Sequence, residues 1–319
     1  MNIELMIQNG SKVYIPIVEE GITWQTERMG SPGELKFSVV KDDIINFTEG
    51  NAVRLKVDGK NVFYGFVFTK KRSKDGIIDV TAYDQLRYLK NKDTYVYTNK
   101  TAGEFIKMIA SDFQMQTGTL ENTGFKIASR VEENTTLFDM VQNALDLTLQ
   151  NKKEMYVMFD DFGKITLKNI SSMVVPILID EETGENFDYT SSIDSDTYNK
   201  VKLTFDNEKT GKRDVYIAQS TANMNTWGML QYFDTLQEGE NGKAKADALL
   251  ELYNKKTRSL SISNAFGDVR VRAGCMIPVQ LNLGDIKTNN LMLVEKCKHI
   301  FKENEHFMDL TLRGGEFVA

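Results

Sequence analysis

Alternating apolar and polar residues dominate the first part of the chain. Leu35–Val39 and Val53–Val57 each alternate with a period of two, which predicts half-buried strands. An apolar strand is predicted at 62–68 after a turn, and another follows a polar tip at 77–82. Strands about ten residues apart are typical of a meander closed into a barrel or a sandwich. We therefore predict a first small β-barrel over residues 1–92.

The pattern changes to a helical period near Thr101. Thr101 and Glu104 have the spacing of a capping box, and the apolar residues that follow lie on one helical face. An apolar stripe predicts a second helix at about 135–149. Residues 155–167 then predict a hairpin. Two helices and a hairpin make a small α+β module, which together with the connector behind it occupies residues 93–190.

This connector, residues 180–196, is acidic and contains no Lys or Arg. A run of like charges favours an extended, solvated segment. A calcium-binding loop is the alternative, but the carboxylates lack the order with which a compact loop brings its oxygens together. The seven carboxylates are Asp180, Glu181, Glu182, Glu185, Asp188, Asp194 and Asp196.

The last third returns to strand patterns. One helix, at about 242–256, interrupts them. We predict a second β-barrel over residues 191–319, with a helical insert at about 225–260. Its strands are expected at 201–205, 214–218, 276–283, 291–298 and 307–312.

The early and late parts of the chain match in three places, in the same order. Gly50–Val57 and Gly274–Leu281 share one pattern of glycine and apolar residues, and Asp79-Val80-Thr81 matches Asp309-Leu310-Thr311. Leu35–Val39 also matches Val201–Phe205. These matches predict an internal duplication. Two similar barrels in one chain would form a ring of six if three chains closed head to tail, and sheet edges could then pair between barrels.

Composition removes several classes of protein. The net charge is −6, which argues against a dedicated nucleic-acid binder, and no apolar run is long enough to cross a membrane. The first residues have no basic and apolar regions of a signal peptide, so we expect no secretory signal. Cys275 and Cys297 are the only cysteines, and we expect reduced thiols in a cytosolic product.

Candidate chemistry is sparse. Cys275, Cys297, His299 and His306 are the sharpest metal hypothesis, because Cys297 and His299 would point to one face of a strand. Their remaining spacing fits no known zinc module, so a packed thiol is favoured. There is also no phosphate loop, nucleophile elbow or metalloprotease helix. We therefore predict no catalytic, cofactor-binding or metal residues and no cofactor.

Three other groups of residues are candidates for function. Asp160 could act as acid or base with Asp161 or Glu154, but a hairpin tip open to water would not shift its pKa. The basic stretch Lys70–Lys74 favours a solvated loop, with contact to an acidic neighbouring subunit or to DNA as the alternative. Trp24 and Trp227 are predicted to be packing residues, and one of them could lie at a subunit interface.

The order of these parts resembles the baseplate hub proteins of contractile phage tails and phage-tail-like bacteriocins, of the XkdQ type. The likeness covers nearly the whole chain through pattern and order. It is carried by Gly50–Val57, Phe63–Phe68, Asp79–Asp84, Thr101–Ile106, Thr136–Asp139, Asp196–Leu203 and Gly274–Leu312.

The resemblance implies a mainly β protein with α+β insertions, in which two tail-tube-like barrels flank the small module. It implies a non-enzymatic homotrimer whose barrels form a pseudo-sixfold ring between the hexameric tail tube and the trimeric central spike. Other baseplate and tape-measure components are then expected partners, and assembly into the particle is expected after synthesis in the bacterial cytoplasm. A carbohydrate- or receptor-binding module is the first alternative, and a wall hydrolase using Asp160 with Glu154 is the second.

Overall fold

The computed structural model describes the chain except for residues 20, 184–185, 195, 208–210, 237–239, 283–286 and 315–319. The described residues form two compact units. The larger contains residues 1–149, 154–188 and 260–319, and the smaller contains residues 150–153 and 189–259. No helix in the described part of the chain is long and apolar enough to span a membrane.

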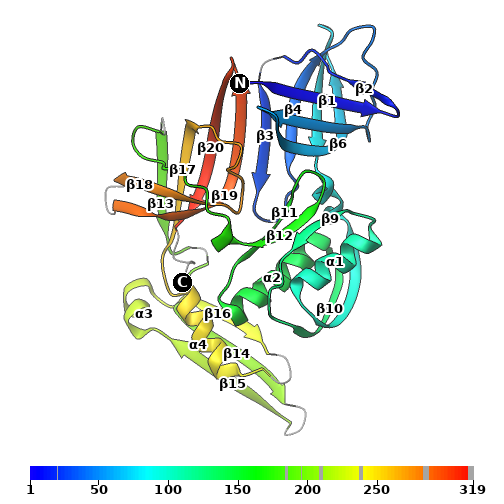
Figure 1. The fold of residues 1–319 in the computed structure, drawn as a ribbon. Coiled ribbons are helices and arrows are strands. Elements are labelled where there is room, and N and C mark those ends of the chain that lie inside the picture. The colour runs from blue at the N-terminus through cyan, green and yellow to red at the C-terminus, as the bar shows by residue number, and fades with distance from the viewer. Residues whose placement is uncertain are drawn as a thin grey trace. The chain divides into compact units, whose positions relative to one another are not determined.

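The first strands form one end of a large, mainly antiparallel sheet (Figure 1). Val53, Leu55 and Val57 alternate inward and are buried, as the sequence pattern predicts. The strands are β1 (Ile3–Asn9), β2 (Lys12–Tyr14), β3 (Ile22–Glu27), β4 (Glu34–Val40), β5 (Ala52–Val57), β6 (Lys60–Arg72) and β7 (Ile77–Tyr83).

The pairing that would close these strands into a barrel is interrupted. β2 pairs with β1 only as far as Tyr14, and a single bridge then joins Val18 to Val39 of β4. Pro16 lies between the two contacts and has no N–H to donate. The mainly β fold class is confirmed. No closed barrel is found among the described strands, so the two barrels stay a prediction.

The α+β module follows and has its own hydrophobic core. Both predicted helices and the hairpin are confirmed: Thr101 and Glu104 form the capping box of α1, and β11 pairs with β12. The elements are the 3-10 helix η1 (Gln85–Lys90), β8 (Lys92–Lys100), α1 (Ala102–Asp112), β9 (Thr117–Leu120), β10 (Ile127–Thr136), α2 (Leu137–Lys152), β11 (Tyr156–Asp160), β12 (Ile165–Asn169) and the 3-10 helix η2 (Ile170–Ser172).

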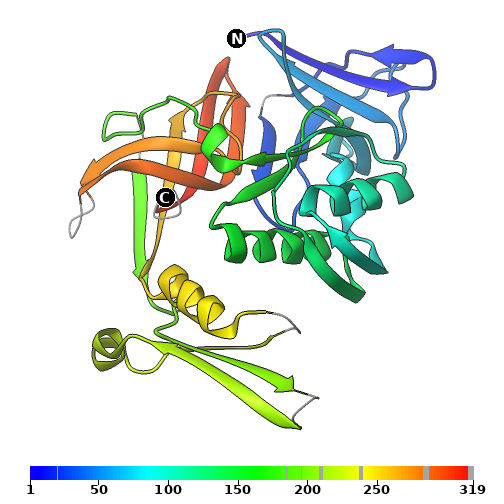
Figure 2. The ribbon, with the colours of Figure 1, turned by 60° about the horizontal axis from the view of Figure 1, so that its bottom comes forward.

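The smaller unit is a three-stranded sheet covered on one face by a helix (Figure 2). Ala246 and Leu249 of the helix pack on Val201 and Leu203. The predicted helical insert lies within this unit. Its elements are β14 (Lys200–Asn207), β15 (Lys212–Gln219), α3 (Thr221–Trp227), β16 (Gln231–Thr235) and α4 (Gly242–Tyr253).

The remaining strands return to the large sheet. They are β13 (Asn186–Ser192), β17 (Thr257–Phe266), β18 (Met276–Asn282), β19 (Lys287–Lys302) and β20 (Glu305–Arg313). β13 forms within the predicted acidic connector: it is extended and five of its seven residues are exposed, but it pairs with β17 and so is part of the sheet. Leu283, the predicted end of one strand, and Glu185 lie outside the described residues.

The strand order repeats. The first repeat, β3-β4-β7-β6-β5, has the same order of pairing as the second repeat, β13-β17-β20-β19-β18. The registers also agree: Ala52 pairs with Phe66 of β6, and Met276 pairs with Leu293 of β19. Even the irregularity between β6 and β7, at Val67 and Thr69, recurs between β19 and β20 at Val294 and Lys296.

Two of the three sequence matches therefore lie at equivalent strands. The third is wrong, because Val201–Phe205 belongs to β14 of the smaller unit. The partner of β4 in the repeat is β17, which holds the matching place beside β20. The mistake has a physical cause, since any half-buried strand shows the same alternation.

Candidate functional site

The two repeats meet where β19 pairs with β3 (Figure 1). We call this pairing the repeat junction. Ion pairs flank it: Arg28 Nε lies 2.7 Å from Glu295 Oε2, and Lys296 Nζ lies 2.9 Å from Glu27 Oε1. Burial by itself would raise the pKa of Glu27, but the hydrogen bond and the charge of Lys296 outweigh it, so this pKa is lowered. The junction thus combines backbone pairing with complementary charge.

The junction gathers three of the four residues of the metal hypothesis. His299 Nε2 lies 2.9 Å from the carbonyl oxygen of Val271 and 3.2 Å from Cys297 Sγ, and His299 Nδ1 lies 2.8 Å from His306 Nε2. Trp24 stacks on the His299 ring with centroids 4.7 Å apart. The contacts are consistent with His306 donating to Nδ1 of His299, which donates from Nε2 to Val271.

Burial keeps this group neutral. It lowers the pKa of His299 to about 3, an effect to which the neighbouring His306 adds, and it lowers the pKa of His306 to about 4. Burial also raises the pKa of the Cys297 thiol well above its usual range. No group of His, Cys, Asp and Glu suited to a metal ion occurs among the described residues. The arrangement is a packed polar stack, in which Cys297 and His299 share a face as the strand period predicts.

A buried charged cluster of Asp84, Asp160 and Arg272 lies beside the stack. Of these residues, only Asp160 was a candidate from the sequence. Asp84 and Asp160 are only 5% and 6% exposed. Asp84 accepts the backbone N–H groups of Gly33 at 2.8 Å and Leu86 at 3.0 Å, and Asp160 accepts from Gln85 Nε2 at 2.9 Å. No local pattern marks these residues as partners, because they come from separate segments of the chain.

Arg272 supplies positive charge to this cluster. Its guanidinium lies 4.1 Å from the centre of the Phe159 ring, and its Nε atom is buried without a hydrogen-bond partner. Burial raises the pKa of both Asp84 and Asp160, and Arg272 opposes this rise. The expectation that Asp160 is open to water and unshifted is therefore wrong: the side chain folds back from the hairpin to accept the Gly163 N–H at 2.7 Å.

The candidate carboxylate pairs for hydrolysis are not assembled. Glu154 precedes β11 and Asp160 ends it, so the length of the strand separates them. Glu154 instead accepts the Tyr156 hydroxyl at 2.7 Å, and Asp161 is exposed. The buried pair that does exist, Asp84 with Asp160, is occupied by structural hydrogen bonds.

The other candidate residues are spread over the molecule. Trp24 is buried, as predicted, and Trp227 is half-buried at the end of α3. Asp180 caps a turn by accepting the hydroxyl and backbone N–H of Thr183 and the N–H of Glu182, which lowers its pKa. Lys71, Arg72 and Lys74 are exposed at the end of β6 and the turn behind it.

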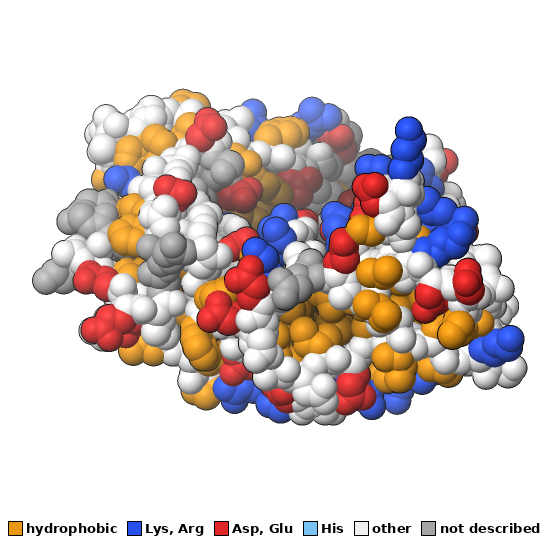
Figure 3. All heavy atoms as spheres, turned by 90° about the horizontal axis from the view of Figure 1, so that it is seen from above, with side chains coloured by type: hydrophobic (Ala, Val, Ile, Leu, Met, Phe, Trp, Pro, Cys, Tyr) orange, Lys and Arg blue, Asp and Glu red, His pale blue; other side chains and the backbone are white. Residues whose placement is uncertain are grey.

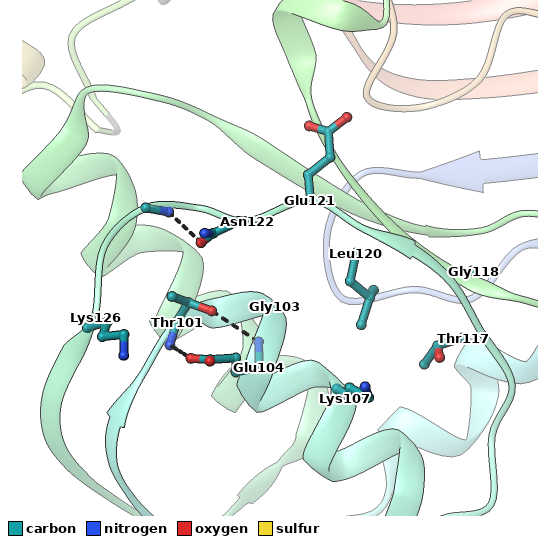
Figure 4. A pocket seen from close by; sticks show the side chains of 11 residues that line it. Thr101, Gly103, Glu104, Lys107, Thr117, Gly118, Leu120, Glu121, Asn122 and Lys126 are labelled. Atoms are coloured by element: carbon teal, nitrogen blue, oxygen red, sulfur yellow. Dashed lines mark hydrogen bonds between the residues drawn. The ribbon is translucent and has the colours of Figure 1, made fainter.

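An open pocket of about 640 Å³ lies at the start of α1 (Figure 4). Glu104 closes the helix N-terminus by accepting the Thr101 N–H at 2.8 Å, and Glu121 accepts the Asn169 N–H at 2.8 Å. Lys107 and Lys126 also line it. Because both carboxylates are engaged in local structure, the pocket assembles no pair for acid–base chemistry.

Curated relatives span almost the whole chain. The phage-like element PBSX protein XkdQ of Bacillus subtilis is 29% identical over 322 residues, covering 97% of this chain and 96% of its own. The protein YqbQ of the same organism is 29% identical over 311 residues, covering 94% and 93%. The resemblance to XkdQ-type proteins is thus confirmed.

Solved structures share the fold. The 43 kDa tail protein of prophage MuSo2 from Shewanella oneidensis has a TM-score of 0.69 at 11% identity, covering 97% of this chain and 98% of its own. The Escherichia coli c3393 protein, a type VI secretion component described as similar to phage T4 tail proteins gp27 and gp5, has a TM-score of 0.57 at 12% identity, covering 98% and 78%. The YQBQ-like family model matches residues 22–313, and the chain therefore belongs to the YQBQ-like family.

Proposed function

We propose that this chain is the structural baseplate hub of a contractile tail or tail-like particle. Three chains would form a ring that joins the hexameric tail tube to the trimeric central spike. The observation that carries the proposal is the internal duplication, in which two repeats within one sheet share strand order, register and irregularity. A chain with two equivalent units is suited to this place, because three copies present six similar units.

The two repeats are the parts of each chain that would build the proposed ring, and both are tube-like β-structures. The first occupies residues 1–92. The second is proposed for residues 191–319, to which the start of β13 at Asn186 is added, and the α+β module is inserted between the two. The name of the relative XkdQ, a protein of a phage-like element, supports a place in a phage tail or tail-like particle, as does the fold shared with the tail protein of prophage MuSo2. Other baseplate and tape-measure components are further proposed partners.

A purely structural role agrees with the chemistry of the junction. Its histidines are neutral and stacked, and the buried carboxylates beside it accept backbone and amide hydrogens. Such groups stabilise the junction between the two repeats, because their polar atoms are occupied by fixed partners. We therefore propose that the protein has no catalytic activity of its own.

The mass of the complex in solution tests the proposal. Light scattering of the purified protein, alone and mixed with tail tube and spike proteins from the same gene cluster, should give three chains per complex. Pull-down should recover both partners. A protein that stays monomeric in every mixture and binds neither partner would contradict the hub. Glycan binding by the isolated chain would favour the receptor-binding alternative.

A further inference from the structure

The second half of β6 has a counterpart in β19. Beyond the shared irregularity, Thr69 pairs with Thr81 of β7, as Lys296 pairs with Thr311 of β20. Lys71 likewise pairs with Asp79, as Lys298 pairs with Asp309. Residues 69–74 of the first repeat therefore correspond to residues 296–301 of the second, which form the repeat junction.

In the second repeat this stretch is covered. β18 pairs with β19 only up to Leu293, and β3 takes over the same side from Lys296 to Phe301. The side chains of Cys297, His299 and Phe301 are consequently buried. Within the chain, this part of the second repeat is therefore paired with a strand of the first repeat, β3.

In the first repeat the same stretch is open. β5 pairs with β6 only up to Phe66, and no other described strand continues along that side. We call residues 69–74 the basic edge, because they carry four Lys or Arg residues and no carboxylate. Lys71, Arg72 and Lys74 are exposed. Lys and Arg side chains gather at the right of the face seen in Figure 3, where the first repeat lies.

The strand that could cover it is β13. By its place beside β17, β13 is the counterpart of β3, which lies beside β4. β3 has a neighbour on both sides, whereas β13 ends the sheet and pairs, among the described strands, with β17 alone. Five of its seven residues are exposed, including Phe187 and Asp188. Asp188 is the one charged residue of β13, and its charge is opposite to that of the basic edge.

The single chain does not make this pairing. β13 ends the described sheet, and six other strands separate it from β6 along the order of pairing. Two copies of the chain can make this pairing, because each chain carries both β13 and the basic edge. When β13 of each chain pairs with the basic edge of the next, the contact repeats around a ring. Open strand edges are also sites at which proteins bind further strands.

We propose that β13 of one chain pairs with the basic edge of β6 in the next chain, so that the contact between subunits repeats the junction within each subunit. The inference rests on the proposed trimeric ring and names the surfaces that close it. Backbone hydrogen bonds extend the sheet from chain to chain. The opposite charges of the two segments select this partner, as Arg28 with Glu295 and Lys296 with Glu27 do within the chain.

Charge reversal tests the pairing in the full-length protein. Lys71→Glu and Asp188→Lys should each weaken trimer formation on the order of tenfold per interface, because each places like charges together. The double variant K71E/D188K should recover most of the loss. Lys212→Glu, on an exposed edge strand of the smaller unit, is the matched control and should leave the trimer unchanged. Association should also weaken as salt is raised.

Cross-linking separates this inference from the proposed function. Arg72→Cys and Thr190→Cys in one chain, treated with a flexible bis-maleimide, should give covalent dimers and trimers and nothing larger. The native Cys275 and Cys297 are buried and should not react. A trimer that forms no such cross-links and ignores both charge reversals would overturn the pairing while leaving the hub intact. A monomer under all conditions, with tube and spike present, would overturn both.

Discussion

Gly50 and Gly274 hold the same place in the two repeats. The backbone N–H of Gly50 donates to Val67 at 2.8 Å, and that of Gly274 donates to Val294 at the same distance. Both residues have positive φ, 86° and 92°. Yet their surroundings differ: open space lies around Gly50, whereas a Cβ on Gly274 would come within 2.5 Å of Val157 in β11. In the second repeat, the α+β module therefore packs against the surface around Gly274, whereas the equivalent surface around Gly50 is open.

This difference predicts unequal costs for one substitution. Gly50→Ala should destabilise by about 1–2 kcal/mol through backbone strain alone. Gly274→Ala should cost about 1–3 kcal/mol more, because the added methyl group overlaps Val157. Urea unfolding of the two variants measures both. Val157→Ala should cost less in the Gly274→Ala background than in the parent protein, and equal costs in the two backgrounds would contradict the clash.

The capping box gives a second prediction. Thr101→Ala should destabilise α1 by about 1 kcal/mol, because the hydroxyl accepts the Glu104 N–H at 3.2 Å. Thr136→Ala offers a comparison at the start of α2, where the Thr136 hydroxyl accepts the Asp139 N–H at 3.1 Å. Thermal unfolding should show similar losses for the two variants. A Thr101→Ser variant that fails to retain most of the stability would argue against the hydroxyl as the cause.

The sequence reveals the basis of these two predictions but not the contacts at the repeat junction. Thr101 and Glu104 are three residues apart, so the helix start follows from spacing, and the Gly50 and Gly274 patterns reveal the duplication. The link from His299 to Trp24 does not follow, because alternation shows that a strand is half-buried but not which strand lies beside it. The same limit hid Arg272 beside Asp84 and Asp160, since each residue lies in an ordinary local pattern.

The buried cluster predicts a large effect at Arg272. Arg272→Met should destabilise by about 2–3 kcal/mol at pH 7, because it removes the cation over Phe159 and leaves two buried carboxylates without a positive neighbour. The loss should shrink as the pH falls, since protonation then neutralises Asp84 and Asp160. Arg270→Met is the control: Arg270 is exposed and pairs with Asp268 at the surface, so its loss should stay within about 0.5 kcal/mol. Equal losses at pH 7 and pH 5 would argue against the role of charge.

The histidine stack predicts that the protein becomes less stable as the pH falls, because the pKa of its histidines is lowered, whereas the pKa of the buried carboxylates is raised. Burial lowers the pKa of His306 from its usual value of about 6.5 to about 4 in the folded protein. Above pH 6.5 the residue is neutral in both the folded and the unfolded state, so its titration leaves stability unchanged there. Between pH 6.5 and 4 the unfolded state binds the proton more readily, so the free energy of unfolding falls by about 1.4 kcal/mol per pH unit for this one residue. His299, with its pKa of about 3, adds a similar slope that extends lower.

His306→Gln isolates this contribution. The Gln amide can still donate to His299 Nδ1 but does not titrate, and the buried carboxylates contribute equally in both proteins. Urea unfolding in a Trp227→Phe background leaves Trp24, which stacks on His299, as the only tryptophan reporter. The stability advantage of the parent protein over the His306→Gln variant should therefore narrow steadily from pH 6.5 to 5, by about 1.4 kcal/mol per pH unit. A constant difference over this range would mean that His306 takes up its proton equally well in the folded junction, and the neutral stack would have to be abandoned.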